Sequence, residues 1–215
     1  MNLLIGSYIG MVVDIEISGD KKHLGTVIDI GSDLIVICTN NKYLYIPITH
    51  IQRIELSPNQ SDQSLPPSQS LLKNKEQISF PQMLNHAKGG FVEIFVTGNQ
   101  SLYGFIINVL DDYLVFDSLG YKTILIPLYH LKWLSPCPPN GQGTPVQPSG
   151  SVLSRTLEEQ LKRSEGKIVI LDMGSSANKI GLMKKIENRV MELEMFNGKK
   201  VYWNLHHIKT VQFPE

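Results

Sequence analysis

The sequence lacks most of the features by which enzymes, secreted proteins and membrane proteins are recognised. Its 215 residues include only two cysteines, which cannot make a disulfide framework. No apolar run approaches the roughly 18 residues that span a bilayer. The segment Met1–Gly6 lacks the basic and hydrophobic stretches of a signal peptide, and no phosphate-binding loop, dinucleotide fingerprint or nucleophile elbow occurs. We therefore expect no enzymatic activity, no cofactor, no signal peptide and no contact with a membrane.

The chain also lacks an excess of charge of either sign. Its 20 lysines and arginines balance 20 aspartates and glutamates, which leaves a formal net charge of zero. Affinity for nucleic acids rests on an excess of Lys and Arg that meets the phosphates. The balance therefore argues against a general nucleic-acid binder.

The two cysteines are expected in different environments. Cys38 ends the apolar run 34–38, where a buried and inert thiol is expected. Cys137 lies in a proline-rich segment and is expected to be exposed, where a thiol can link one chain to another.

The sequence does contain one pattern that is repeated three times. Each copy closes on an apolar run followed by a histidine, and the matched histidines are His50, His130 and His207. A glycine precedes each histidine by 25 or 26 residues, and these glycines are Gly25, Gly104 and Gly181. Such near-constant spacing predicts three modules of one fold, each about fifty residues long.

Within one copy the pattern is typical of short strands. Val13, Ile15 and Ile17 are separated by acidic residues, which gives the period of a half-buried strand. The strands expected in the first copy are 12–17, 25–30, 34–38, 43–48 and 51–56. A glycine inside a strand, such as Gly25, marks a bulge or a tight bend. Each copy is therefore expected to form a strongly bent antiparallel sheet or a partly closed barrel.

Short helices and linkers separate these modules. Ser79 and Ser154 are expected to cap helices that precede the second and third copies. Segments 57–78 and 135–151 are rich in Pro, Ser, Gln and Gly and are expected to be flexible linkers. The resulting organisation is a β-module at 1–56, a helix and β-module at 79–134, and a helix and β-module at 152–215. Modules that pair through their edge strands and modules that hang as separate beads are both compatible with this pattern.

The first copy resembles a family of domains from spore-forming bacilli, some members of which are described as spore coat proteins. The segments that carry this resemblance are Leu4–Gly6, Val12–Ile17, Gly25–Asp33 and Tyr45–Ile51. The order of a short helix and five bent strands is also similar to the Sm and Hfq barrels. The resemblance extends over all three copies. It implies a mainly β fold of three tandem Sm-like or SH3-like five-stranded modules, each with a short N-terminal helix.

The resemblance implies two possible functions. The first is a structural or assembly protein of the spore coat, made in the mother-cell cytoplasm, whose modules associate with each other or with other coat proteins. The alternative is RNA binding of the Sm or Hfq kind. In Hfq a Lys-His pair in the last strands contacts RNA, so His50, His130 and His207 are the candidate contacts. No lysine precedes any of them, and a structural role in a turn between the last two strands is favoured.

The third copy differs from the others in its charge. Lys184, Lys185 and Arg189 contribute to a basic surface that would suit RNA or another anionic partner, although a solvated strand face is favoured. The pair His206–His207, with Asp172 or Glu192, is a possible start of a metal site. Adjacent strand residues point to opposite faces of a sheet, so no metal site is expected there.

Overall fold

The chain folds into two compact units that are rich in antiparallel strands. The computed structural model describes residues 5–19, 21–58, 79–98, 101–138 and 152–214. Unit 1 contains residues 1–101 and 132–141, and unit 2 contains residues 102–131 and 142–215. Strands dominate both units, which confirms the prediction of a mainly β protein.

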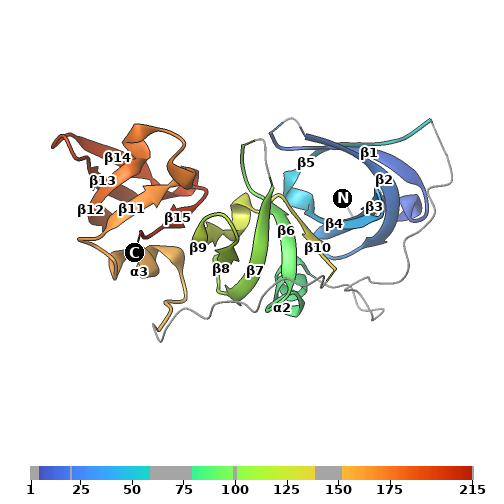
Figure 1. Cartoon of the computed structure of the whole chain (residues 1–215). Helices are drawn as coiled ribbons and strands as arrows, with labels where there is room; N and C mark the ends of the chain where they lie inside the picture. Colours follow the sequence, from blue (N-terminus) through green and yellow to red (C-terminus); the bar gives the residue numbers. More distant parts are fainter. Residues whose placement is uncertain (1–4, 20, 59–78, 99–100, 139–151, 215) are drawn as a thin grey trace. The chain divides into compact units, whose positions relative to one another are not determined.

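Unit 1 holds seven strands in the order β5-β1-β2-β3-β4-β10-β6, and their pairings are antiparallel. The strands are β1 (Val12–Ile17), β2 (Lys21–Ile30), β3 (Leu34–Thr39), β4 (Lys42–Pro47), β5 (Ile51–Leu56), β6 (Phe91–Phe95) and β10 (Trp133–Pro136). The helical segments are η1 (Gly6–Tyr8), η2 (Ile48–His50) and α2 (Phe80–His86). The first five strands belong to the first copy and curl around its core (Figure 1).

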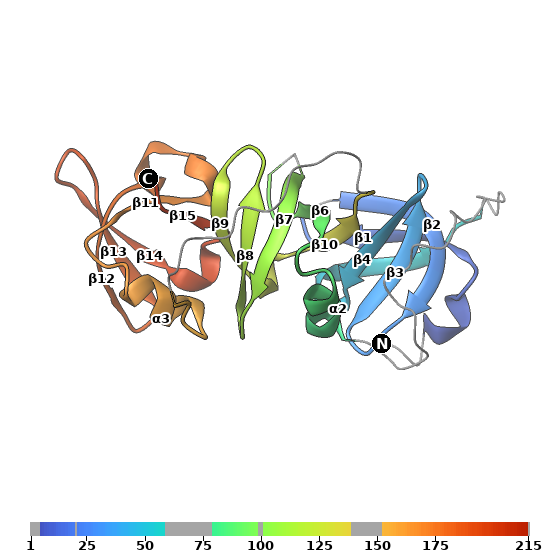
Figure 2. The same ribbon diagram turned by 60° about the horizontal axis from the view of Figure 1, so that its bottom comes forward.

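Unit 2 holds eight strands in the order β14-β13-β12-β11-β15-β9-β8-β7, and these pairings are antiparallel as well. The strands are β7 (Leu102–Val109), β8 (Tyr113–Ser118), β9 (Lys122–Pro127), β11 (Ile168–Leu171), β12 (Ile180–Glu187), β13 (Val190–Glu194), β14 (Lys200–Asn204) and β15 (Val211–Gln212). Figure 2 shows β7, β8 and β9 side by side.

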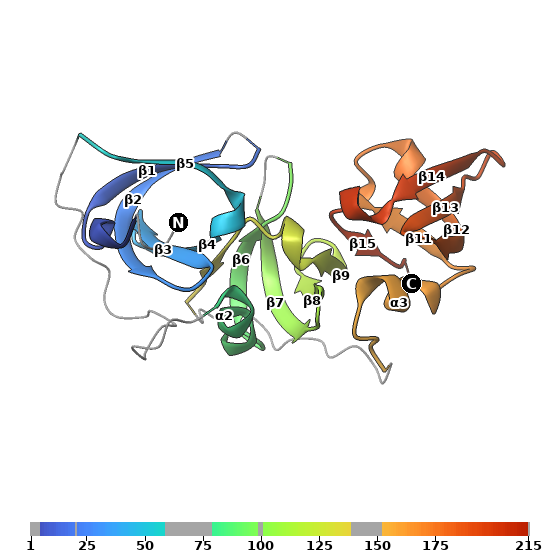
Figure 3. The same ribbon diagram turned by 180° about the vertical axis from the view of Figure 1, so that it is seen from behind.

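The helical segments of unit 2 are short. They are η3 (Leu128–His130), α3 (Leu157–Lys162), η4 (Asp172–Gly174), η5 (Ala177–Lys179) and η6 (Leu205–His207). The helix α3 packs against β12 of the third copy (Figure 3). Among the helices of the described ranges, none is long and apolar enough to cross a membrane.

The core of the first copy follows from the alternation in its sequence. Val13, Ile15 and Ile17 of β1 are fully buried, while the residues between them are partly exposed. The strand β3 is buried along nearly its whole length, as its continuous apolar run requires. Each such side chain contributes about 1.5–3 kcal/mol through its removal from water. The side-chain pattern thus decides which face of each strand meets the core.

The matched glycines lie where the backbone of a neighbouring strand comes closest. A Cβ atom at Gly25, Gly104 or Gly181 would lie 2.0–2.6 Å from a carbonyl oxygen of the next strand. Three residues further on, each of the three strands carries a bulge, at Ile28, Ile107 and Lys184. A bulge bends its strand and increases the local twist. The prediction that these glycines mark bent strands is confirmed in all three copies.

Some boundaries differ from the prediction because strand pairing extends past the apolar runs. Ser135 and Pro136, which composition placed in the linker 135–151, form the end of β10 and pair with β6. The strand β2 begins at Lys21 instead of Gly25, since its first residues pair with β1. Most of both predicted linkers, residues 59–78 and 139–151, lies outside the described residues.

The predicted helix caps were right at one helix and wrong at the other. Ser79 caps α2 and forms a capping box with Gln82. At α3 the cap is Thr156, whose hydroxyl accepts a hydrogen bond from the Glu159 N–H at 3.4 Å. Ser154 lies before the helix, where its carbonyl oxygen accepts a hydrogen bond from the Tyr113 hydroxyl at 2.9 Å.

The prediction that Cys137 is exposed was wrong. Its backbone N–H donates to the Phe91 carbonyl oxygen at 3.0 Å, which extends the pairing of β10 with β6 and leaves the side chain half-buried. Burial, and then the nearby Glu93, raise the pKa of the Cys137 thiol. Burial also raises the pKa of Cys38, which is buried as predicted. Neither thiol is activated, since both are shifted away from the reactive thiolate.

Candidate functional site

Both units contain the same kind of junction, in which the fourth strand of one copy pairs with the fifth strand of the next copy. In unit 1, Leu134 of β10 lies opposite Tyr45 of β4. In unit 2, Val211 of β15 lies opposite Leu125 of β9. Leu134 and Val211 each follow a matched histidine by four residues, and Tyr45 and Leu125 each precede one by five. The two junctions therefore have the same register. Strand pairing joins successive copies, which are not separate beads.

Each junction also contains an aspartate that holds the first helix of the following copy. Asp33 Oδ1 accepts a hydrogen bond from the N–H of Phe80, the first residue of α2, at 2.6 Å. Asp112 Oδ1 accepts one from the N–H of Leu157, the first residue of α3, at 2.8 Å. The first amides of a helix have no partner inside the helix and carry partial positive charge, so a carboxylate stabilises them. The helix of each later copy is thereby anchored to the copy before it.

The matched histidines each end a single 3₁₀ turn between the fourth and fifth strands of their copy. His50, in unit 1, places Nδ1 3.1 Å from the Ser18 hydroxyl oxygen. The His50 carbonyl oxygen accepts a hydrogen bond from the Ser18 N–H at 2.9 Å. This turn is therefore tied to the end of β1. The location of the histidines in a turn between the last two strands agrees with the sequence prediction.

In unit 2 the turn η3 contacts the turn η6. The Tyr129 hydroxyl donates to the Leu205 carbonyl oxygen at 3.1 Å, and the Tyr129 ring stacks on His206 with centroids 4.6 Å apart. His130 Nε2 lies 2.9 Å from the His206 carbonyl oxygen. Because a carbonyl only accepts, His130 carries its proton on Nε2 and donates. Tyr129 and His130 of the second copy are thus fastened to the third copy.

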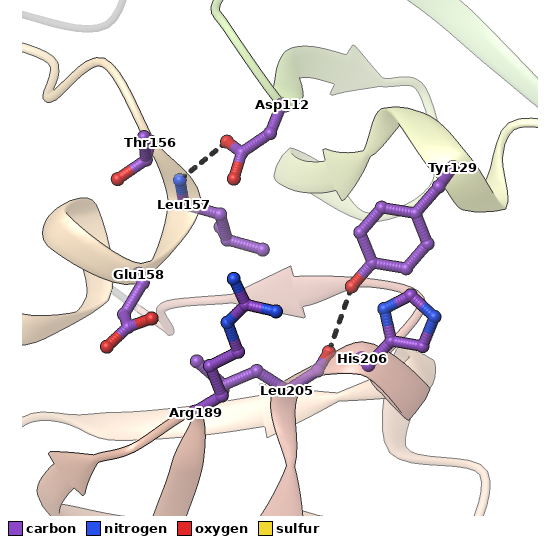
Figure 4. Close-up of a pocket in the computed structure, with 8 residues that line it drawn as sticks. All are labelled: Asp112, Tyr129, Thr156, Leu157, Glu158, Arg189, Leu205 and His206. Atoms are coloured by element: carbon purple, nitrogen blue, oxygen red, sulfur yellow. Dashed lines mark hydrogen bonds between the residues drawn. The ribbon is translucent and has the colours of Figure 1, made fainter.

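A pocket of about 370 Å³ lies beside these contacts in unit 2 (Figure 4). Its lining residues are Asp112, Tyr129, Thr156, Leu157, Glu158, Arg189, Leu205 and His206. Figure 4 shows the hydrogen bonds from Leu157 to Asp112 and from Tyr129 to Leu205 in its walls. The volume would suit a small ligand, yet these polar groups already join the second copy to the third. The pocket is therefore part of the junction between the second and the third copy.

The two lysines of the third copy that were predicted as part of a contact surface each pair with a glutamate. Lys184 pairs with Glu194 at 3.3 Å, and Lys185 pairs with Glu187 at 2.7 Å. Arg189 lines the pocket. The neighbouring carboxylates therefore reduce the net positive charge that these two lysines offer to an anionic partner.

The predicted start of a metal site is occupied by protein groups. The Asp172 carboxylate is hydrogen-bonded to the Lys179 ammonium and to the backbone N–H groups of Lys209 and Thr210. Within the ranges that the structure describes, no three residues of the metal-binding types come together. Asp172 therefore acts as an internal anchor between η4, η5 and β15.

The third copy departs from the others at the position of the anchoring aspartate. The Asp112 carbonyl oxygen accepts a hydrogen bond from the Leu128 N–H at 2.9 Å, and the Arg189 carbonyl oxygen accepts one from the Leu205 N–H at the same distance. Arg189 thus stands where the first two copies have aspartate. A guanidinium has no acceptor atom, so it cannot hold the start of a following helix.

Sequence reasoning missed the aspartates and Tyr129 as junction residues. Asp33 and Asp112 each directly precede a strand, so the local sequence around either residue indicates only a turn. Their recurrence at one place in the first two copies, together with Arg189 in the third, is the signal that could have separated an anchor from a turn. Tyr129 carries no such signal, since the first copy has Thr49 at that place.

These features define a tandem-repeat β protein whose three copies are joined by pairing of edge strands. The chain is 37% identical over 222 residues to the uncharacterized protein YwrJ of Bacillus subtilis strain 168, and the alignment covers 98% of this chain and 99% of that protein. Residues 156–211 match the family model described as YwrJ third domain. The chain therefore belongs to the YwrJ family, and the residues matched by the model fall within its third copy.

The His130 contact predicts a pH dependence of stability. Burial lowers the pKa of His130 to about 4, so between pH 6.5 and 4 the unfolded chain binds a proton that the folded chain does not. The resulting stability is complete above pH 6.5 and is lost as the pH falls toward 4. Because the ring is partly exposed, we expect a loss of about 1–2 kcal/mol.

Guanidinium unfolding at pH 4.5 and pH 7.5 tests this expectation. The decline in the free energy of unfolding should be smaller by that amount in His130→Gln than in the natural chain. Both proteins contain the same other titrating groups, so equal declines would show that His130 does not carry the effect.

Proposed function

We propose that this protein is a structural or assembly protein without enzymatic activity, whose modules associate with each other or with other protein subunits. The observation that carries the proposal is the repeated junction, in which β4 meets β10 and β9 meets β15 in one register. The first and the second copy each pair their fourth strand with the fifth strand of the next copy, and this repeated pairing supports side-by-side association of the modules. The polar groups of the pocket hold copies together, which agrees with an assembly role.

We further propose that each module is a small bent barrel of the Sm-like or SH3-like kind. Its support is the order of a short helix and five strands, with a glycine and a bulge at the same place in the second strand of every copy. The fourth strands of the first two copies, β4 and β9, each pair with the fifth strand of the next copy.

The location that we propose is the spore coat, reached from the mother-cell cytoplasm. Its support is the resemblance of the first copy to domains of spore-forming bacilli, together with the relative in Bacillus subtilis. A coat layer requires subunits that bind one another through extended surfaces, and exposed edge strands provide such surfaces.

Fractionation of a sporulating culture tests this location. We expect the protein in the coat extract of purified mature spores and its absence from vegetative cells, because a coat component is made during sporulation. A soluble cytoplasmic enzyme followed in the same fractions controls for trapped cell contents. Detection in vegetative cytoplasm alone would rule out a coat component.

RNA binding is the competing function, and the paired lysines argue against it. Lys184 and Lys185 each face a glutamate, and His130 donates to a backbone carbonyl of the third copy. Filter binding with U-rich and A-rich RNA at several salt concentrations separates the two functions. If the protein binds RNA tightly and in a salt-sensitive way, and if substitution of His50 and His130 abolishes this binding, RNA binding becomes the favoured function in place of assembly.

A further inference from the structure

The third copy exposes the residue that the first two copies bury at their junctions. Tyr45 of β4 is 0% exposed and Leu125 of β9 is 6% exposed, because the fifth strand of the next copy lies opposite each of them. The residue at the same place in β14 is Tyr202, which is 62% exposed. The strand β14 ends the strand order of unit 2, and no strand of the described residues pairs with its outer edge. A large aromatic side chain therefore lies at a junction position that no other strand of the described part of the chain covers.

In the first copy, the junction residue of the fifth strand is less buried than the matching residues of the later copies. Leu134 of β10 and Val211 of β15, the residues that enter the junctions, are both 0% exposed. The matched residue of β5 is Ile54, which is only partly buried, and its neighbour Leu56 is 46% exposed. The strand β5 ends the strand order of unit 1, again with no partner on its outer edge among the described residues. One chain thus carries a fourth strand, β14, and a fifth strand, β5, whose outer edges pair with no other strand of the described residues.

We propose that β14 of one chain pairs antiparallel with β5 of a second copy of this chain, with Tyr202 opposite Ile54. This inference rests on the proposed assembly function and names its partner. A second copy is the occupant because both internal junctions use the same strands in the same register, so the chain itself supplies the matching edge. The contact is heterologous, and it leaves a further β14 and a further β5 available on the pair.

The register of the internal junctions gives chemically compatible neighbours along this contact. With Tyr202 opposite Ile54, Trp203 lies opposite Arg53 and Lys200 lies opposite Leu56. The aliphatic part of Arg53 can pack against the Trp203 ring, and no two like charges oppose each other. Cross-strand pairs of these kinds each stabilise a sheet by roughly 0.2–1 kcal/mol.

The contact lacks one element of the internal junctions. Arg189 replaces the aspartate that anchors the following helix, so strand pairing must act without that hydrogen bond. A small interface of this kind binds weakly, with a dissociation constant on the order of micromolar or higher. We therefore expect the mass measured by sedimentation to rise above the 24.2 kDa of a single chain as concentration increases.

Cysteine cross-linking of the full chain tests the predicted register. In a Cys137→Ser background, Ile54→Cys and Tyr202→Cys are made in separate chains and oxidised alone or as an equal mixture. Opposed residues of an antiparallel pair have Cβ atoms about 4.5–5.5 Å apart, close to disulfide distance. We expect covalent dimers in the mixture and their loss when either variant is oxidised alone. Leu56→Cys with Lys200→Cys provides a second pair if Ile54→Cys fails to fold.

The matched control is Leu119→Cys, since Leu119 is 71% exposed and lies in the turn between β8 and β9. The proposal is overturned if the mixture gives no dimer, if Tyr202→Cys gives equal dimer alone, or if Leu119→Cys replaces Tyr202→Cys without loss. A chain that remains a monomer at every concentration overturns it as well. A monomer found in the spore coat would refute this contact and leave the proposed function intact, whereas a cross-linked dimer absent from spores would do the reverse.

Discussion

Replacing Gly104 by alanine is expected to lower the free energy of unfolding of unit 2 by about 3 kcal/mol. A Cβ atom at this position would lie 2.0 Å from the Asp117 carbonyl oxygen and 2.9 Å from the Ser118 Cα atom. Both are backbone atoms of β8, so no side chain can rotate away to make room. The strands β7 and β8 would have to separate, and their hydrogen bonds would lengthen. Guanidinium unfolding followed by circular dichroism measures the loss.

Gly120→Ala is the matched control for this substitution. Gly120 lies in the turn between β8 and β9 of the same unit, and an added Cβ atom would meet no atom within 4 Å. Alanine restricts the unfolded chain more than glycine does, so this variant should keep its stability or gain up to about 1 kcal/mol. Equal stability of the two variants would show that the approach of β8 does not require glycine at position 104.

The bent strands could be predicted from the sequence because their signals are local. Alternation along β1 depends only on which side chains face the core, and Gly25 precedes its bulge by three residues in the same strand. The recurrence of such signals at one spacing identified three copies. Local patterns therefore determined the fold of a single module.

The junctions could not be predicted, because they depend on residues far apart in the chain. Asp33 holds a helix 47 residues away, and Asp112 holds one 45 residues away. The local sequence around an apolar residue in a fourth strand has the same alternation whether the residue is covered by another strand or exposed to water. Leu125 and Tyr202 occupy one position of the repeat, yet only Leu125 is buried. Which strand edge pairs with a neighbouring copy depends on the register between the copies. The hydrophobic periodicity within one copy carries no information about that register.

Asp172→Ala is expected to destabilise unit 2 by about 3–5 kcal/mol. The Asp172 side chain is 7% exposed and pairs with Lys179, whose side chain is 18% exposed. It also accepts hydrogen bonds from the Lys209 N–H at 2.6 Å and the Thr210 N–H at 3.2 Å. Its removal leaves a largely buried ammonium without its partner and two amides without an acceptor. Asp172→Asn keeps an acceptor and tolerates the left-handed backbone at this residue, where φ is +47°, so it should lose less.

The loss of the Asp172 carboxylate should also destabilise the junction between the second and third copies. The amides that it holds belong to Lys209 and Thr210, which directly precede Val211, and Val211 pairs with Leu125 of the second copy. We expect faster hydrogen exchange of β15 in Asp172→Ala and unchanged exchange in α2, which belongs to unit 1. Glu187→Gln removes the partner of Lys185 in an exposed pair and should leave both stability and exchange unchanged. If Asp172→Ala matched that control, the buried ion pair would be dispensable, and the strand pairing of β15 would have to hold the third copy to the second without it.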